Sequence, residues 1–162
     1  MKNKLFKDLC VIVVSFKSQT KILKLIKNLN KSIAVTIIEN SKDINLKLAI
    51  EKKYKNVKVI IPKYNRGIAY SINLATKKTK KKYIMYLASD INVKNNQIIK
   101  LLKKANDIKI FGAITAKIHD QNYTDLIINP EKTNGLTEVS FNTGCIMLMK
   151  KDLMKKINYF DD

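Results

Sequence analysis

The sequence contains few of the residues on which many small catalytic and structural motifs depend. Its 162 residues include four glycines, two prolines, two cysteines, one histidine and no tryptophan. Two cysteines cannot form a disulfide framework. Glycine occurs only at positions 67, 112, 135 and 144, so neither glycine-rich loop of the GxGxxG or GxxxxGK[ST] type is present. These absences disfavour a typical dinucleotide-dependent oxidoreductase and a P-loop nucleotidase.

The scarce histidine and cysteine also disfavour a zinc site and a Ser/His/Asp catalytic arrangement. His119 lies in a stretch without hydrophobic periodicity, which is typical of a surface loop, and Cys10 and Cys145 are far from it in sequence. Both cysteines lie in apolar, strand-like runs, which predicts buried thiols. No apolar run approaches the roughly 18–20 residues of a membrane span, and no signal-peptide cleavage site follows residues 9–14. We therefore expect a cytoplasmic protein.

Acidic residues are scarce relative to basic ones. Lysine and arginine number 32 against 13 aspartates and glutamates, which gives a formal charge of +19. Arg66 is the only arginine, and lysine, isoleucine and asparagine are abundant along the whole chain, which indicates a general compositional bias. Nucleic-acid-binding domains more often cluster their charge and use arginine. A basic nucleic-acid-binding domain stays an alternative, but we expect no specific nucleic acid, whereas anionic ligands and the anionic inner face of a membrane are favoured partners.

Hydrophobic periodicity predicts an alternation of strands and helices. Continuous β-branched runs are typical of strands covered on both faces, and apolar spacings of three and four predict amphipathic helices. The predicted strands are 9–15, 33–39, 57–61, 82–88, 108–116 and 139–149, and the predicted helices are 18–30, 43–54, 66–79, 95–105 and 150–157. Residues 117–138 lack a period and predict a loop. The pattern implies one α/β domain over 1–162, a three-layer α/β/α sandwich with a mostly parallel, Rossmann-like sheet.

Polar residues follow four of the predicted strands, at the end where open α/β sheets place their ligand. They are Ser15, Glu39, Asn40, Arg66, Asp90 and Asn92. Oxygen atoms of Asp90 and Asn92 suit Mg²⁺ or Mn²⁺, which binds one or two carboxylates and completes its shell with substrate phosphates. Glu39 could accept a hydrogen bond from a base or a ribose hydroxyl, although a helix cap or a solvated loop is the alternative for each acid. Their shared position predicts one cleft.

Six segments, in order along the chain, resemble motifs of the family 2 glycosyltransferases, which have the GT-A fold. They are VIVVSFK at 11–17, IIENSKD at 37–43, NRGIAYSIN at 65–73, YIMYLASD at 83–90, NTGCIMLMKK at 142–151 and NYFDD at 158–162. The resemblance extends from residue 9 to 162. It implies transfer of a sugar, with inversion, from a nucleotide diphosphate sugar to a glycan or lipid-linked hydroxyl, as in polysaccharide biosynthesis.

The resemblance also implies roles for individual residues. Those expected to bind the nucleotide sugar are Ser15, Phe16, Glu39, Asn40, Arg66, Asp90 and Gly144. Phe16 would flank the base, and Arg66 would lie near the diphosphate. Asp90 corresponds to the aspartate that binds Mg²⁺ or Mn²⁺. Gly144 would lie on the side of the sugar and the acceptor.

The sequence departs from the family pattern at several positions. Glu39 stands where the family usually has aspartate, and Ala88 and Ser89 stand where many members have a further acid or Asn-Pro. The acidic motif that usually supplies the catalytic base would follow the last matching segment, which leaves Asp161 and Asp162 as candidates for the base. We therefore expect a donor-binding part of a transferase with little or no transfer alone. A non-catalytic nucleotide-sugar-binding module is the alternative.

Overall fold

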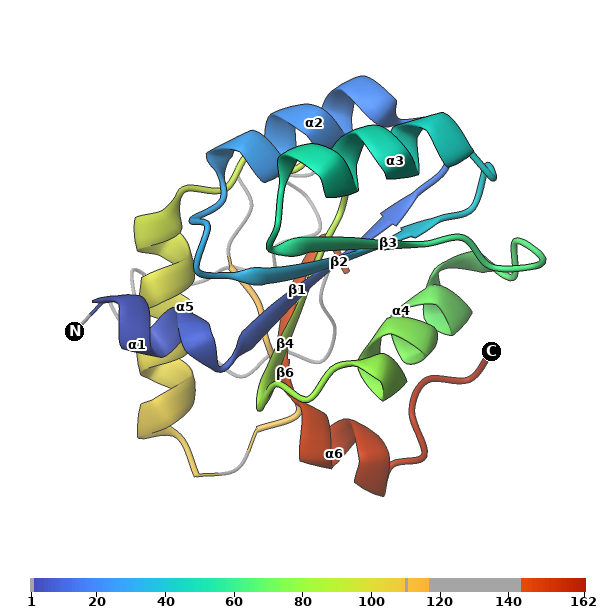
Figure 1. The fold of residues 1–162 in the computed structure, drawn as a ribbon. Helices are drawn as coiled ribbons and strands as arrows, with labels where there is room; N and C mark the ends of the chain where they lie inside the picture. The colour runs from blue at the N-terminus through green and yellow to red at the C-terminus, as the bar shows by residue number, and fades with distance from the viewer. Residues whose placement is uncertain (1, 110, 117–143) are drawn as a thin grey trace, which may run out of the picture.

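A mixed β-sheet carries helices on both of its faces in the computed structural model, which describes residues 2–109, 111–116 and 144–162 (Figure 1). The strands are β1 (Leu9–Ser15), β2 (Ala34–Glu39), β3 (Val57–Ile60), β4 (Tyr83–Leu87), β5 (Ala113–Ile114) and β6 (Ile146–Lys150). The helices are α1 (Lys2–Lys7), α2 (Gln19–Asn28), α3 (Ile44–Lys53), α4 (Gly67–Lys78), α5 (Asn95–Asp107) and α6 (Lys151–Lys156).

The sheet is mostly parallel, as the alternation of elements predicts. Its six strands lie in the order β3-β2-β1-β4-β6-β5. Strands β3, β2, β1 and β4 run parallel to one another, whereas β6 runs antiparallel to both β4 and β5. Parallel neighbours need crossover connections, which is why a helix follows each of the first three strands.

Two apolar clusters hold the three layers together. On one face, helices α2, α3 and α5 pack against side chains such as Val11 and Val13 of β1. On the other face, α4 and α6 pack against side chains such as Ile12 of β1 and Ile84 of β4 (Figure 1). Because successive residues of a strand point to opposite faces, the continuous apolar runs of β1 and β4 supply both clusters. The predicted three-layer sandwich is confirmed.

Several predicted elements differ in extent. The predicted strand 108–116 is wrong for most of its length, because Ile108 closes α5 through a 3.2 Å hydrogen bond from its N–H to Lys104 O, and only β5 pairs. Helix α1 was not predicted from the sequence; Phe6 anchors it in the core. Cys10 is buried as predicted, whereas Cys145 is only partly buried. The predicted loop 117–138, His119 and residues 139–143 lie outside the described residues.

None of the helices in the described ranges is long and apolar enough to cross a membrane.

Candidate functional site

The parallel register brings the ends of three strands to one edge of the sheet. Ser15 pairs with Glu39 across β1 and β2, and Val13 pairs with Leu87 across β1 and β4. A 2.9 Å hydrogen bond from the N–H of Ala88 to Cys145 O adds the start of β6 to the same edge. The prediction that the carboxyl ends of these strands meet is confirmed, and the segments that follow them form the rim of the site.

A cleft of about 560 Å³ opens at this edge. It is lined by residues 14 and 16–21, by Ile68 of α4, and by Tyr86 and residues 88–90. Phe16 and Ile68 are each 55% exposed, which is unusual for large apolar side chains. Exposed apolar surface inside a concavity is typical of a ligand site, and an exposed aromatic ring offers a face on which a planar base can stack.

The charged side chains of the cleft are two lysines and one carboxylate among the described lining residues. Lys21 Nζ lies 3.4 Å from Asp90 Oδ2, and the two side chains are 59% and 60% exposed. Lys17 Nζ lies 5.6 Å from the centre of the Phe16 ring. The cleft therefore carries excess positive charge next to an aromatic surface, which suits an anionic ligand with an aromatic part.

Tyr86 is a further polar group in the cleft wall. Burial raises the pKa of its phenol, and Cys145 and Asp90 add to this effect because negative charge near the ring disfavours the phenolate. The phenol is consequently neutral at physiological pH and can both donate and accept a hydrogen bond.

Asp90 and Asn92, the two predicted metal ligands, line a second hollow of about 250 Å³ beside the main cleft. Lys21, Lys24 and Asn28 of α2 line its other side. Within the described ranges, no three His, Cys, Asp or Glu side chains come together to form a metal cage. The donor set nevertheless fits Mg²⁺ or Mn²⁺ held jointly by a protein and a substrate, because one or two carboxylates with water and phosphate oxygens complete such a shell.

The prediction that one cleft unites the strand-end residues does not hold for Glu39 and Asn40, which are buried and do not line the cleft. Glu39 Oε1 accepts hydrogen bonds from the N–H of Ser41, at 2.8 Å, and from the Ser41 hydroxyl. Asn40 Nδ2 donates to Ser71 Oγ at 3.1 Å. Glu39 Oε2 and Asn40 Oδ1 have no hydrogen-bond partner among the described residues. Buried acceptors without a partner are rare, so both oxygens are candidates for accepting hydrogen bonds from a ligand.

Ser15 is fully buried next to this pair, and its Oγ lies 3.2 Å from Ser18 Oγ at the start of α2. Gly144 stands beside Cys145 with φ of +69°, a conformation that glycine adopts readily. Because Cys145 O accepts the hydrogen bond from Ala88, Gly144 lies close to the end of β4.

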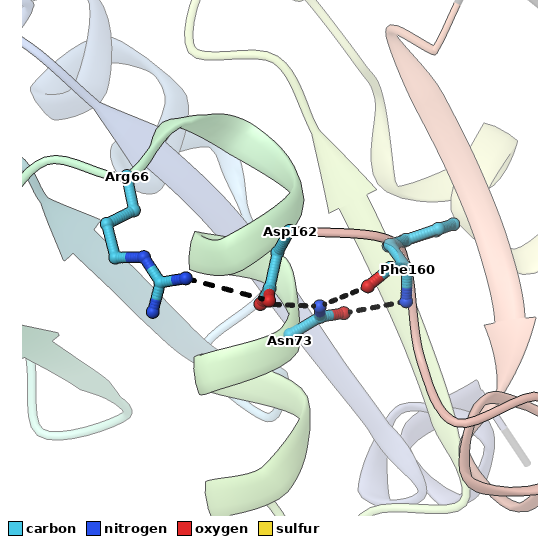
Figure 2. A network of polar contacts seen from close by, with 4 residues as sticks. All are labelled: Arg66, Asn73, Phe160 and Asp162. Carbon is cyan, nitrogen blue, oxygen red and sulfur yellow. Dashed lines mark hydrogen bonds and ion pairs between the residues drawn. The ribbon is translucent and has the colours of Figure 1, made fainter.

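Arg66 forms a separate group with the last residues of the chain (Figure 2). It precedes α4, which begins at Gly67 with φ of +85°, and Asn65 Oδ1 accepts a 3.0 Å hydrogen bond from the Gly67 N–H. The Arg66 guanidinium lies 4.4 Å from the centre of the Tyr70 ring and, through Nη2, 3.9 Å from Asp162 Oδ1. Arg66 therefore lies at the N-terminus of α4, two residues before Ile68 in the cleft wall.

Asn73 of α4 fixes this terminal segment, and sequence reasoning did not identify it as a site residue. Its Nδ2 donates to Phe160 O at 2.8 Å and to Asp162 Oδ2 at 3.0 Å, while its Oδ1 accepts from the Phe160 N–H at 3.1 Å. Asp161 is exposed. The signal that could have found Asn73 is a polar residue on the buried face of a predicted helix.

The structure thus sorts the predicted residues into three places. Phe16 and Asp90 share the cleft, and Asn92 lies in the adjoining hollow. Ser15, Glu39 and Asn40 form a buried polar cluster at the ends of β1 and β2. Arg66 and Asp162 lie at the start of α4.

Three residues of the cleft were not predicted as site residues: Lys17, Lys21 and Tyr86. Nothing in a lysine-rich sequence distinguishes these two lysines from the others, or this tyrosine from an ordinary strand residue.

Comparison with known proteins agrees with this geometry. Residues 10–157 match the family "Glycosyl transferase family 2". An uncharacterized protein of Methanocaldococcus jannaschii is 38% identical over 113 residues, which are 62% of this chain and 49% of that protein.

Solved structures resemble the fold at low sequence identity. A mannosyltransferase from Pyrobaculum calidifontis, in complex with GDP-Man and Mn²⁺, superposes with a TM-score of 0.72 at 12% identity, over 95% of this chain and 47% of that one. TarS 1–349 from S. aureus gives a TM-score of 0.64 at 18% identity, over 95% of this chain and 50% of that one. The chain spans about half the length of these relatives. It belongs to glycosyl transferase family 2 and has the α/β fold of the GT-A glycosyltransferases.

Proposed function

We propose that the cleft binds a nucleotide diphosphate sugar with Mg²⁺ or Mn²⁺, and that the protein serves to transfer the sugar to a hydroxyl of a glycan or a lipid-linked acceptor. The observation that carries this proposal is the convergence of Phe16, Lys17, Lys21 and Asp90 in one cleft at the carboxyl edge of the sheet. A structural neighbour in complex with GDP-Man and Mn²⁺ supports the pairing of such a donor with such a metal.

The nucleoside would occupy the part of the cleft next to β1 and β2. The exposed ring of Phe16 offers a stacking surface for the base. Glu39 Oε2 and Asn40 Oδ1 are buried acceptors without partners among the described residues, and N–H or O–H groups of the base or ribose would satisfy them once a shift of the segment at Ser41 exposes them to the cleft. Ser15 supports this corner from beneath through its contact with Ser18.

The diphosphate would lie between the lysines and Asp90. Lys17 and Lys21 supply positive charge, and Asp90 with Asn92 would hold the divalent cation. When bound, such a cation stabilises negative charge on the departing diphosphate. Arg66, at the N-terminus of α4, adds a further cation to the same end of the sheet.

The sugar and acceptor would lie on the side of Gly144 and the last residues. Asp161 and Asp162 are the candidates for the base that deprotonates the acceptor hydroxyl, and inversion at the sugar carbon is the stereochemical outcome we propose. The lysines are spread along the sequence and Arg66 is the only arginine, so nothing in the sequence favours a nucleic acid as the partner. A non-catalytic donor-binding module shares the same cleft and differs only in forming no product.

The test is calorimetric titration with UDP-, GDP- and dTDP-sugars, with and without Mn²⁺. We expect one donor class to bind in a Mn²⁺-dependent manner, and Asp90→Asn to abolish the Mn²⁺-dependent part of the affinity. Asp107→Asn is the matched control, because it removes the same charge from an exposed position on α5 outside both hollows. Unchanged metal-dependent binding in Asp90→Asn would overturn the site, and a transfer assay separates a transferase from a binding module.

A further inference from the structure

Arg66 has an anionic partner within the chain before any ligand arrives. The Asp162 carboxylate lies 3.9 Å from its Nη2, with the arginine side chain 52% exposed and the aspartate side chain 28% exposed (Figure 2). The contact is a single long one, whereas a guanidinium binds phosphate best through two parallel N–H donors. The pair therefore leaves the phosphate-binding capacity of Arg66 largely unused.

Asp162 does not reach Arg66 by chance, because Asn73 holds it there. Asn73 is 2% exposed and forms hydrogen bonds with both backbone polar groups of Phe160 as well as with Asp162 Oδ2. Its side chain thus fixes the segment and the carboxylate together, with the other carboxylate oxygen, Oδ1, directed at Arg66 (Figure 2). Little conformational freedom is left for Asp162 to lose when it pairs with the arginine.

We propose that Asp162 is a built-in competitor of the donor diphosphate for Arg66, with Asn73 as the residue that positions it. In the ligand-free protein the carboxylate compensates part of the charge of the guanidinium. The diphosphate replaces this contact by a stronger one, and Asp162 then keeps only its hydrogen bond from Asn73. This inference rests on the proposed function, because it requires a diphosphate at the N-terminus of α4.

The exchange links the two sides of the site. If the diphosphate has to break the ion pair between Arg66 and Asp162, then part of its binding free energy is lost in doing so. Removing Asp162 should therefore strengthen diphosphate binding by the free energy of that ion pair. Exposed ion pairs contribute little, so removing Asp162 is expected to tighten nucleoside diphosphate binding by about two- to fivefold.

The neighbouring Asp161 provides a matched control. Asp162→Asn and Asp161→Asn remove the same charge one residue apart, and only Asp162 contacts Arg66. We would titrate UDP and GDP into the wild type, both variants, Arg66→Gln and the double variant Arg66→Gln/Asp162→Asn, by calorimetry at fixed salt and Mn²⁺. Asp162→Asn should bind more tightly than Asp161→Asn, and this difference should vanish in the Arg66→Gln background.

The outcomes are distinguishable. Equal nucleotide affinities of Asp162→Asn and Asp161→Asn overturn the competition. A gain in affinity from Asp162→Asn that persists in the Arg66→Gln background overturns it as well. Both results refute the competition even when Asp90→Asn loses Mn²⁺-dependent binding and the donor site is thereby supported. A wild-type protein that binds neither nucleotide overturns the proposed function, and the competition with it. Loss of binding in Asp162→Asn would instead show that the carboxylate supports the ligand, and this too contradicts the inference.

Discussion

Replacing Lys21 with glutamine is expected to strengthen Mn²⁺ binding while weakening nucleotide binding without metal. In the ligand-free protein Lys21 Nζ lies 3.4 Å from Asp90 Oδ2. Under the proposed function Asp90 is the carboxylate that receives the divalent cation, so the ammonium and the metal compete for it. The same ammonium would meet the phosphates of a nucleotide, where its loss removes an attraction. The substitution therefore moves two affinities in opposite directions.

The magnitude follows from the geometry of the pair. Unit charges 3.4 Å apart attract each other by about 1.2 kcal/mol in water. Both side chains are more than half exposed, so screening and the entropy of ordering two side chains reduce this to about 0.2–1 kcal/mol. Mn²⁺ should consequently bind Lys21→Gln up to about fivefold more tightly than it binds the wild type.

The assay is the electron paramagnetic resonance signal of free Mn²⁺, which falls as the ion binds, recorded without nucleotide. Lys27→Gln is the matched control, because Lys27 is exposed on the same helix and lines neither hollow. It reports the effect of lowering the net charge by one. If the two variants bind Mn²⁺ equally well, the competition at Asp90 is refuted. If Lys21→Gln also leaves metal-free UDP or GDP binding unchanged, the lysine has no part in the site.

Three further expectations concern stability. Gly67→Ala should lower the free energy of unfolding, measured in urea, by about 1–2 kcal/mol. A Cβ at this position would meet open space, so the cost comes from the backbone strain of alanine at a φ of +85°. An unchanged urea midpoint would contradict this. The Leu46 amide holds the pKa of Asp43 below 3.8, so the stability advantage over Asp43→Ala should be present above pH 3.8 and shrink as pH falls further. Burial raises the pKa of Tyr86 above 10.0, so stability should fall as pH rises beyond that value, and less steeply in Tyr86→Phe.

The central part of the fold could be predicted because its strands are buried on both faces. A β-branched run such as β1 has no amphipathic period, and its shortness and β-branched composition favour a strand covered on both faces. The edge of the sheet was less predictable. Residues 108–116 have the composition of a strand, yet β5 holds two residues, because pairing there depends on β6, which joins it from far along the chain. Local sequence does not encode such a long-range partner.

The candidate site was predictable to the level of strand ends but not to the level of contacts. The position of Asp90 followed from topology, since ligands lie at the carboxyl edge of open sheets, whereas that of Phe16 followed from the resemblance to the family 2 glycosyltransferases. The burial of Glu39 did not follow, because it depends on Ser41 folding back onto its carboxylate. Asn73 was missed for a similar reason: its partners lie 87 and 89 residues further along the chain.

The two ion pairs of the site follow one physical rule. Lys21 with Asp90 and Arg66 with Asp162 each join a cation suited to phosphate with a carboxylate suited to a metal or an acceptor proton. Such pairs compensate charges that would otherwise stand unpaired in the ligand-free protein, and because they are long and partly exposed they are weak enough to exchange. A donor with its metal carries both the anion and the cation needed to replace the two internal partners. Donor and metal should therefore each bind more tightly in the presence of the other, because the metal that takes up Asp90 releases Lys21 for the donor phosphates, and the phosphates that take up Lys21 release Asp90 for the metal.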